Sequence, residues 1–239
     1  MLNKVSEFAK ENNLNINEAQ LVKLEGFCSF LAEKNKSLNL TSIEDPHEVE
    51  IKHLVDSFEA APTIEQLKDR ESFSLVDVGT GAGFPGIPLK IIYPEAEFTL
   101  LDSLQKRVKF LTEASEFLGL ENMNCVAARA EEFGRTENRE HFDFCVSRAV
   151  AQMNILLEYC LPLVRTGGYC LLYKSGDFEQ ELTAAEKALK TLNGKFIKAE
   201  KFELPESFGT RSILIIKKTG ETPDKYPRRP GKPQKSPLI

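Results

Sequence analysis

The sequence predicts an α/β protein of the Rossmann-like class, with a mostly parallel β-sheet and a helical extension in front of it. From residue 73 onward, short apolar runs alternate with longer amphipathic stretches, the pattern of a parallel sheet covered by helices on both faces. A glycine-rich turn, Gly-Thr-Gly-Ala-Gly at residues 79–83, follows the first run. We therefore expect three parts: a helical extension over residues 1–70, the α/β domain over 71–218 and a basic, proline-rich C-terminal arm over 219–239.

The first part of the chain carries helix signals. Asn17 followed by Gln20 predicts a capping box at the start of a helix, and apolar residues then recur at three- and four-residue spacing. A second helix is expected to begin after Pro46 and to end at Pro62 or shortly before it. These helices would form the extension that precedes the sheet.

The α/β part divides into strands and helices by its apolar runs. Five runs predict parallel strands at residues 75–78, 98–101, 125–127, 142–146 and 169–173. The stretches between them predict helices at residues 85–93, 104–118, 154–164 and 178–192. Two late runs, 196–202 and 212–217, have only a short loop between them, which favours an antiparallel pair closing one edge. The last 21 residues contain five prolines, so we expect a loop or arm there and no packed element.

Charge is spread unevenly along the chain. The net charge is −5, which argues against wholesale coating by nucleic acid. Residues 217–239 hold seven lysines and arginines against two acidic residues, so this segment is +5 and residues 1–216 are −10. A basic tail on an acidic body favours a local anionic partner, and a solvated, flexible tail is the alternative.

Other features of the composition point to a cytoplasmic protein. No apolar run reaches the roughly 18 residues needed to span a membrane, and the charged N-terminus does not resemble a secretory signal. The five cysteines form no C-x-x-C pair, so we expect reduced, buried thiols. With only three histidines, none spaced with a cysteine pair, no zinc site or other metal is expected.

The glycine-rich turn is the first candidate binding feature. An apolar run delivers the chain to it, and a helix is expected to begin near Pro85. Glycines allow positive φ and a close approach to a ligand, and the first turn of a helix offers unpaired N–H groups. The turn, with Gly79 and Gly81, is thus typical of a nucleotide-like cofactor site; an ordinary tight turn is the alternative.

Asp102 is the second candidate, at the end of the second strand and 23 residues after Gly79. A carboxylate there can accept hydrogen bonds from both ribose hydroxyls of an adenosine. Ser103 and Leu104 follow where the adenine edge would pack. The alternative role for Asp102 is to cap the helix over 104–118, and both roles can hold together.

Two further turns would lie at the same edge of the sheet as the glycine-rich turn and Asp102. Residues 128–132 follow the third strand, where backbone groups of Ala130 and Glu131 could read the adenine edge; a plain helix start with acidic residues is the alternative. Arg148 follows the fourth strand and could clamp a carboxylate, a phosphate or a guanine edge. An ordinary surface ion pair is the alternative for Arg148.

The glycine spacing favours a methyltransferase over a dehydrogenase. The turn reads G-x-G-x-G and lacks the closely spaced G-x-G-x-x-G of dinucleotide sites. Asp77 lies two residues before the first glycine, and a carboxylate suits a sulfonium cation better than a diphosphate. Gly167-Gly168, expected before the fifth strand, and the late strand pair fit a seven-stranded sheet. We therefore predict a class I methyltransferase that uses S-adenosylmethionine.

The chain also resembles a known family, RsmG, also called glucose-inhibited division protein B. The resemblance covers nearly the whole sequence and combines the glycine turn with its proline pattern and the basic tail. It rests on residues 76–88, 101–107, 129–131 and 147–149, on residues 39–41 and 53–57 of the extension, and on residues 226–233 of the arm.

The resemblance implies methylation of guanine N7 in bacterial 16S rRNA, at position 527 in the 530 loop region, on naked rRNA, a precursor or the small ribosomal subunit. It implies no membrane partner, and we expect a monomer. With Gly81 added from the glycine turn, the implied cofactor contacts are Gly79, Gly81, Phe84, Asp102, Ser103, Leu104, Ala130, Glu131 and Arg148.

Guanine N7 carries an in-plane lone pair, so direct in-line attack on a methyl group needs no general base, and we expect no catalytic acid or base. Contacts to the RNA are expected from Arg148, Tyr226, Arg228, Arg229 and Lys232, with the tyrosine stacking on a base. His53 and Asp56 could face the target base or hold the extension against the main domain. A methyltransferase of a protein or small molecule, and a non-catalytic nucleotide- or RNA-binding module, are the alternatives.

Overall fold

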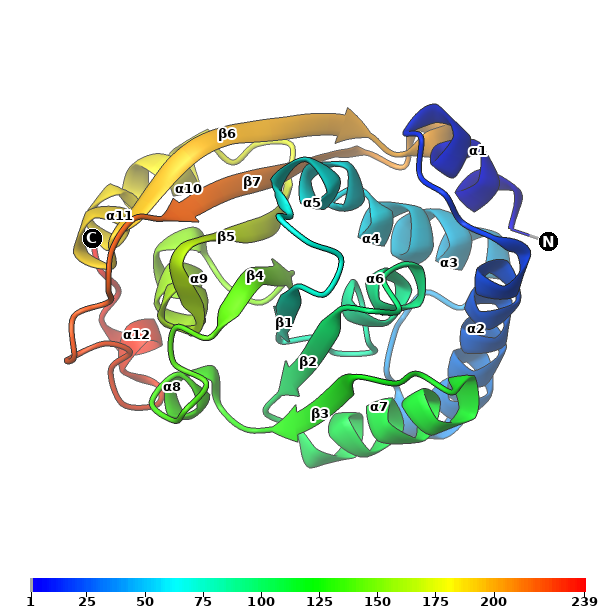
Figure 1. Cartoon of the computed structure of the whole chain (residues 1–239), viewed down its shortest axis with the longest axis horizontal. Helices are drawn as coiled ribbons and strands as arrows, with labels where there is room; N and C mark the ends of the chain where they lie inside the picture. Colours follow the sequence, from blue (N-terminus) through cyan, green and yellow to red (C-terminus); the bar gives the residue numbers. More distant parts are fainter. Residues whose placement is uncertain (1) are drawn as a thin grey trace.

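A computed structural model describes residues 2–239 and has a seven-stranded sheet at its centre (Figure 1). The strand order is β3-β2-β1-β4-β5-β7-β6. Strands β1 to β5 run parallel, and β7 is antiparallel to both β5 and β6, so the expected antiparallel pair at one edge is confirmed. The strands are β1 (Ser74–Val78), β2 (Glu97–Asp102), β3 (Met123–Ala127), β4 (Phe142–Arg148), β5 (Val164–Ser175), β6 (Gly194–Glu203) and β7 (Thr210–Lys218).

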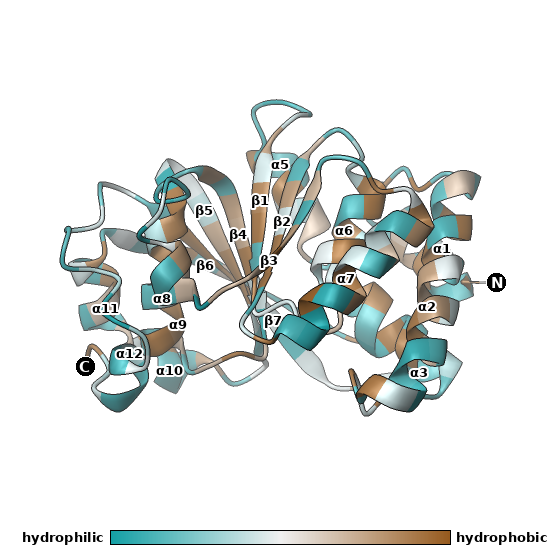
Figure 2. Cartoon of the chain, turned by 90° about the horizontal axis from the view of Figure 1, so that it is seen from below, coloured by the Kyte–Doolittle hydropathy of each residue, from teal (hydrophilic) through white to brown (hydrophobic). Residues whose placement is uncertain are grey.

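Helices cover both faces of the sheet (Figure 2). One side holds the N-terminal helices together with α6 and α7, and the other holds α8 to α12. On the first side lie α1 (Asn3–Glu11), α2 (Glu18–Leu38), α3 (Pro46–Val49), the π-helix η1 (Glu50–Val55), α4 (Asp56–Phe58), α5 (Ala61–Leu67), α6 (Gly86–Ile92) and α7 (Gln105–Leu118). On the second lie α8 (Ala130–Phe133), α9 (Met153–Cys160), α10 (Glu179–Ala184), α11 (Glu186–Thr191) and α12 (Lys232–Lys235).

Two hydrophobic cores result because successive side chains of a strand point to opposite faces. In β1, Leu75 belongs to the core on the α6–α7 side and Val76 to the core on the α9 side. The first core also contains Phe27 and Phe58 of the N-terminal segment. The extension therefore shares a core with the sheet.

The N-terminal helices differ in part from the expectation. The capping box is confirmed, since Asn17 accepts from the N–H of Gln20 and the Gln20 side chain accepts from the N–H of Asn17. The helix expected after Pro46 is confirmed: α3, the π-helical segment η1 and α4 follow one another without a gap from Pro46 to Phe58. Pro62 lies in the first turn of a further helix, α5, where its missing N–H costs nothing. The helix that begins at Pro46 ends at Phe58, shortly before this proline, as expected.

Two boundaries in the second half of the chain are also corrected. The helix expected over 154–164 ends at Cys160, and β5 begins at Val164, so Gly167 and Gly168 lie inside that strand. A Cβ on Gly168 would lie 2.6 Å from the carbonyl oxygen of Asp143, so the two strands pass too closely there for a side chain. The helix expected over 178–192 is divided into α10 and α11.

The C-terminal segment is packed against the α9 side, so the expectation of a loose arm is wrong. Tyr226 and Leu238 are 7% and 8% exposed and belong to the second core. Arg228 donates from its Nε and Nη2 to the buried carboxylate of Glu158, at 2.8 and 2.6 Å. Side-chain anchors of this kind hold a proline-rich segment without any hydrophobic periodicity, which is why the sequence pattern did not reveal them.

The five cysteines are free thiols, and three of them, Cys145, Cys160 and Cys170, are buried. Burial raises the pKa of the Cys145 and Cys160 thiols, which keeps them protonated and unreactive. Within residues 2–239, no helix combines the length and the apolar character that crossing a membrane would require.

Candidate functional site

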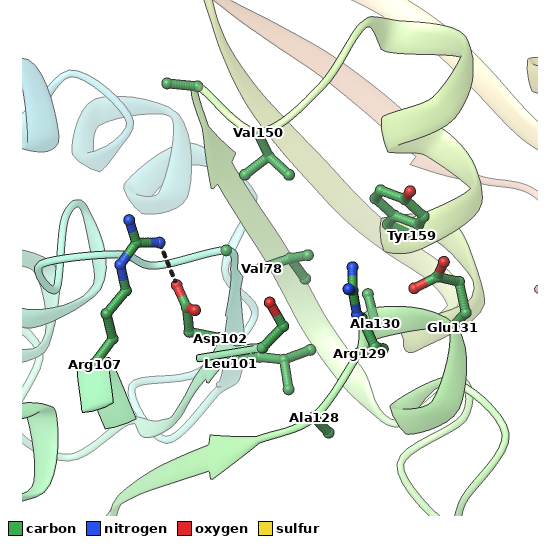
Figure 3. Close-up of a pocket in the computed structure, with 13 residues that line it drawn as sticks. Val78, Leu101, Asp102, Arg107, Ala128, Arg129, Ala130, Glu131, Val150 and Tyr159 are labelled. Carbon is green, nitrogen blue, oxygen red and sulfur yellow. Dashed lines mark hydrogen bonds and ion pairs between the residues drawn. The ribbon is translucent and has the colours of Figure 1, made fainter. Parts of the chain in front are cut away.

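A cavity of about 260 Å³ lies at the carboxyl ends of β1, β2, β3 and β4, and we call it the first cavity (Figure 3). Ligands of open α/β sheets bind at this edge. Asp102 and Arg107 stand on one side of it, with Glu131 and Tyr159 on the other. Five of the predicted cofactor residues line it together: Gly79, Asp102, Ser103, Ala130 and Glu131.

Asp102 is held firmly in the wall of this cavity, where it is 4% exposed. Its Oδ1 accepts from the N–H of Leu104 at 2.9 Å, and its Oδ2 accepts from the N–H of Gly81 at 3.1 Å and from Arg107 Nη1 at 3.2 Å. Gly81 and Leu104 therefore fix the carboxylate and do not line the cavity. Because Leu104 is the N-cap of α7, Asp102 fastens the start of that helix while it also faces the cavity.

The glycine turn brings the backbone close to the same cavity. Gly79 has φ of 73°, and its N–H donates to the carbonyl oxygen of Leu101 at 2.8 Å. A Cβ at this position would lie 2.4 Å from a methyl carbon of Val150. Both the positive φ and the close approach demand glycine here.

The opposite wall is the start of α8. The N–H groups of Ala130 and Glu131 belong to its first turn, so they have no acceptor within the helix. The Glu131 side chain is 3% exposed, and its Oε1 accepts from the N–H of Gly231 at 2.9 Å. The C-terminal segment therefore reaches the wall of the first cavity.

Asp77 lies outside the cavity. It is fully buried, and its Oδ2 accepts from the N–H of Gly86 at 2.9 Å. Burial raises the pKa of Asp77 to about 7, against the opposing effects of Thr80, the Gly86 N–H and Arg148. This residue fastens the end of the glycine turn.

Phe84 and Arg148 turn toward the N-terminal segment and do not line the first cavity. The Phe84 ring is stacked on His53 with 4.4 Å between centroids. Arg148 Nη1 donates to Asp56 Oδ2 at 2.5 Å and to the carbonyl oxygen of Lys52 at 3.2 Å, and Nη2 lies 3.2 Å from His53 Nδ1. His53 and Asp56 thus join the extension to the end of β4, as one of the two sequence interpretations expected.

The environment of His53 fixes its protonation state. Burial and the neighbouring Arg148 lower the pKa of His53 to about 3, so the ring is neutral at pH 7. An arginine can only donate, so Nδ1 is the acceptor and Nε2 carries the proton toward Thr41 Oγ1, 2.9 Å away.

A second cavity, of about 190 Å³, adjoins the first, and Ala149 lines both. Arg148, Tyr173 and Lys174 line it from the sheet, while Asp56 contributes from the N-terminal segment and Arg211 from the start of β7. Ala149 has φ of 57°, a left-handed backbone conformation that is uncommon for alanine.

The residues expected to contact RNA divide into two groups. Tyr226 is buried and Arg228 is paired with Glu158, so neither side chain is free in the way that this prediction requires. Arg229 and Lys232 are exposed on the same segment, and Arg148 lies at the second cavity.

Several residues that line the first cavity were not predicted from the sequence, among them Arg107, Val150 and Tyr159. Arg107 was detectable, since a basic residue in the first turn of a helix, five positions after the strand-end carboxylate, can reach back to it. Tyr159 comes from α9, on the face of the sheet opposite α6 and α7, and no local spacing in the sequence indicates that it reaches this cavity.

Comparison with known sequences identifies relatives along almost the entire chain. Residues 20–208 match the family described as GidB, rRNA small subunit methyltransferase G. A protein of Alkaliphilus metalliredigens named ribosomal RNA small subunit methyltransferase G is 45% identical over 230 residues, covering 96% of this chain and 95% of that protein. A protein of Acetivibrio thermocellus with the same name is 46% identical over 233 residues, covering 97% and 94%.

Among solved structures, the O-methyltransferase from Bacillus cereus in complex with SAH superposes with a TM-score of 0.56 at 15% identity. The match covers 80% of this chain and 91% of that chain. At this identity the likeness concerns the fold, and it confirms the predicted class I methyltransferase architecture.

Proposed function

Because the chain belongs to the rRNA small subunit methyltransferase G family, we propose that it transfers the methyl group of S-adenosylmethionine to N7 of a guanine in bacterial 16S rRNA. The observation that carries the proposal is the fixed Asp102 carboxylate beside the Gly79 turn, at the sheet edge where such folds bind ligands. The expected target is position 527, in the 530 loop region. The expected setting is a monomer acting in the cytoplasm.

The residues of the first cavity fit an adenosine-containing cofactor. Asp102 Oδ1 accepts only the N–H of Leu104, so it keeps a lone pair that can accept from one ribose hydroxyl. Oδ2 can accept from the second hydroxyl once that hydroxyl displaces Arg107 Nη1, and the nearby guanidinium balances the charge of the carboxylate. The free N–H groups at the start of α8 suit the acceptor nitrogens of an adenine edge. The glycine turn leaves room for the ligand to approach the backbone.

Methylation of guanine N7 requires the protein to do little more than align the base with the methyl group. The sulfonium group of the bound cofactor supplies an electrophilic methyl group, and guanine N7 attacks it with a lone pair that is already free at pH 7. The protein has to hold N7 in line and exclude water, which can lower the barrier by about 7–11 kcal/mol. His53 is neutral and bonded to Arg148, so it serves this arrangement by orienting the arginine and takes up no proton.

We expect residues outside the two cavities to bind the rRNA substrate. Arg229 and Lys232 are exposed on the C-terminal segment, within a few residues of Gly231, which bonds to the wall of the first cavity. Positive side chains there can contact phosphates of the rRNA and set its position over the sheet edge.

The test is methyl transfer from isotopically labelled S-adenosylmethionine to small ribosomal subunits or 16S rRNA from cells lacking this protein. We expect labelled 7-methylguanosine by mass spectrometry of the digested RNA, at one position. The Asp102→Ala variant should lose most of this signal at low cofactor concentration. No labelled 7-methylguanosine from either substrate, or label in protein instead, would contradict the proposal.

A further inference from the structure

The second cavity contains a buried carboxylate with one oxygen unused. Asp56 is 4% exposed, and its Oδ2 accepts from Arg148 at 2.5 Å. Its Oδ1 has no hydrogen-bond partner among residues 2–239. The nearby Arg211 Nε is 4.0 Å from this oxygen, too far for a hydrogen bond. A buried acceptor left in this state is destabilising unless a donor completes it.

Other polar groups in the cavity wall already have partners within the protein. The Tyr173 hydroxyl donates to the carbonyl oxygen of Ser57 at 2.6 Å. Lys174 Nζ donates to the carbonyl oxygen of Ala151 at 2.9 Å and to Glu181 at 2.6 Å. Asp56 Oδ1 therefore stands out as an acceptor that a ligand could satisfy.

We propose that the second cavity receives the target guanine and that Asp56 Oδ1 accepts hydrogen bonds from its N1–H and its N2 amino group. This inference rests on the proposed methylation of guanine N7. Guanine is the purine whose Watson–Crick edge offers two adjacent donors, whereas adenine presents an acceptor at N1, which a carboxylate repels. Recognition at that edge leaves N7 free, as direct methylation demands.

The shared wall of the two cavities supports the assignment. Ala149 lines both, so a base in the second cavity lies next to a cofactor in the first. Arg148 keeps the Asp56 carboxylate in place, and Arg148 is itself held by the Lys52 carbonyl and packed 5.4 Å above the Phe84 ring. The acceptor is therefore fixed before the base arrives, which favours recognition.

Entry of the base requires one side chain to move. Asp56 Oδ1 is buried, and the Arg211 side chain near it is 37% exposed. Arg211 Nη1 donates to the carbonyl oxygen of the adjacent Thr210 at 3.1 Å. Because this contact is local and exposed, Arg211 can swing outward and make room for the donors of guanine.

The experiment compares rRNA carrying guanine or inosine at the target position, with methyl transfer measured under single-turnover conditions. Inosine lacks the N2 amino group and keeps N1–H and N7. We expect the wild-type protein to methylate inosine about tenfold more slowly, because one donor to Asp56 is missing. Methylation of guanine and inosine at equal rates would overturn the proposal while leaving the proposed function intact.

The Asp56→Asn variant tests whether this residue reads the base. It should methylate guanine at least tenfold more slowly than wild type, and its guanine-to-inosine ratio should fall toward one. The matched control, Glu48→Gln, removes a carboxylate that pairs with Lys52 at 2.8 Å outside the cavity, and it should keep the wild-type ratio. Calorimetry with S-adenosylhomocysteine should give unchanged affinity for both variants.

The outcomes separate the two proposals. A variant that loses activity on guanine and inosine equally would show that Asp56 acts only by holding Arg148, and it would overturn this inference. If Asp56→Asn does not fold, the rates of the wild-type protein on the guanine and inosine RNAs still test this inference. Absence of methyl transfer to any guanine would overturn the proposed function, and this inference with it.

Discussion

The two ends of the chain serve different cavities. The N-terminal segment contributes Asp56 to the wall of the second cavity, and the C-terminal segment bonds through Gly231 to Glu131 in the wall of the first. They also differ in attachment. Phe27 and Phe58 fix the N-terminal segment within a large apolar core, whereas a buried ion pair is a main anchor of the C-terminal segment. Both terminal segments are packed against the rest of the protein. Because their attachments differ, we expect substitutions in each segment to have different effects.

The largest effect is expected on stability, when the ion pair that anchors the C-terminal segment is removed. Arg228→Ala leaves the fully buried Glu158 carboxylate without its cation, which should lower the free energy of unfolding by about 3–5 kcal/mol. Chemical denaturation measures this. Arg229→Ala, at the neighbouring exposed position, is the control and should leave stability nearly unchanged. Equal stability of the two variants would contradict the account of how this end is held.

This packing also excludes a simple truncation test. Removing residues 219–239 would withdraw Tyr226 and Leu238 from the second core and leave Glu158 unpaired. Loss of activity after such a deletion would report on folding, so point substitutions on the exposed face are the informative changes.

A smaller effect is expected at the first cavity. Asp102→Ala should weaken binding of S-adenosylmethionine by about 1.5–3 kcal/mol, because two hydrogen bonds to a charged acceptor are lost. Calorimetry measures the dissociation constant, and Glu132→Gln, an exposed neighbour of Glu131, is the control. An unchanged dissociation constant for Asp102→Ala would remove this residue from the cofactor site.

The N-terminal attachment should depend on pH through His53. Its pKa is about 3 in the folded protein against 6.5 ordinarily, so only the unfolded chain takes up this proton between those values. Stability is therefore full above pH 6.5 and falls as pH decreases, by up to about 1.4 kcal/mol per pH unit from this group. His53→Gln should remove that part of the slope in urea titrations between pH 6.5 and 4.5. An identical slope in both proteins would contradict the assignment.

The smallest effect is expected at the exposed basic residues of the C-terminal segment. Replacing Arg229 and Lys232 together by alanine should weaken RNA binding severalfold. Each lost phosphate contact should reduce the slope of log affinity against log salt by about 0.7–0.9. Affinity for S-adenosylmethionine should not change. An unaltered salt slope would indicate that the RNA lies elsewhere.

Sequence reasoning reached the parts of the site that depend on local signals. Gly79 and Asp102 were predicted because a strand end followed by a turn has a characteristic composition, and the sheet brings both to one cavity. The bonds from Arg148 to Asp56 and from Gly231 to Glu131 join residues 92 and 100 positions apart, and no periodicity encodes such pairs. The long-range bonds depend on how the two ends fold back over the sheet, which only the structure reveals.

The most direct measurement is a crystal structure of the protein with S-adenosylmethionine. The account predicts the cofactor in the first cavity, with both ribose hydroxyls on the Asp102 carboxylate, the adenine at the start of α8 and the sulfonium end toward Ala149. A cofactor bound away from the Gly79 turn, or with its ribose turned from Asp102, would contradict it.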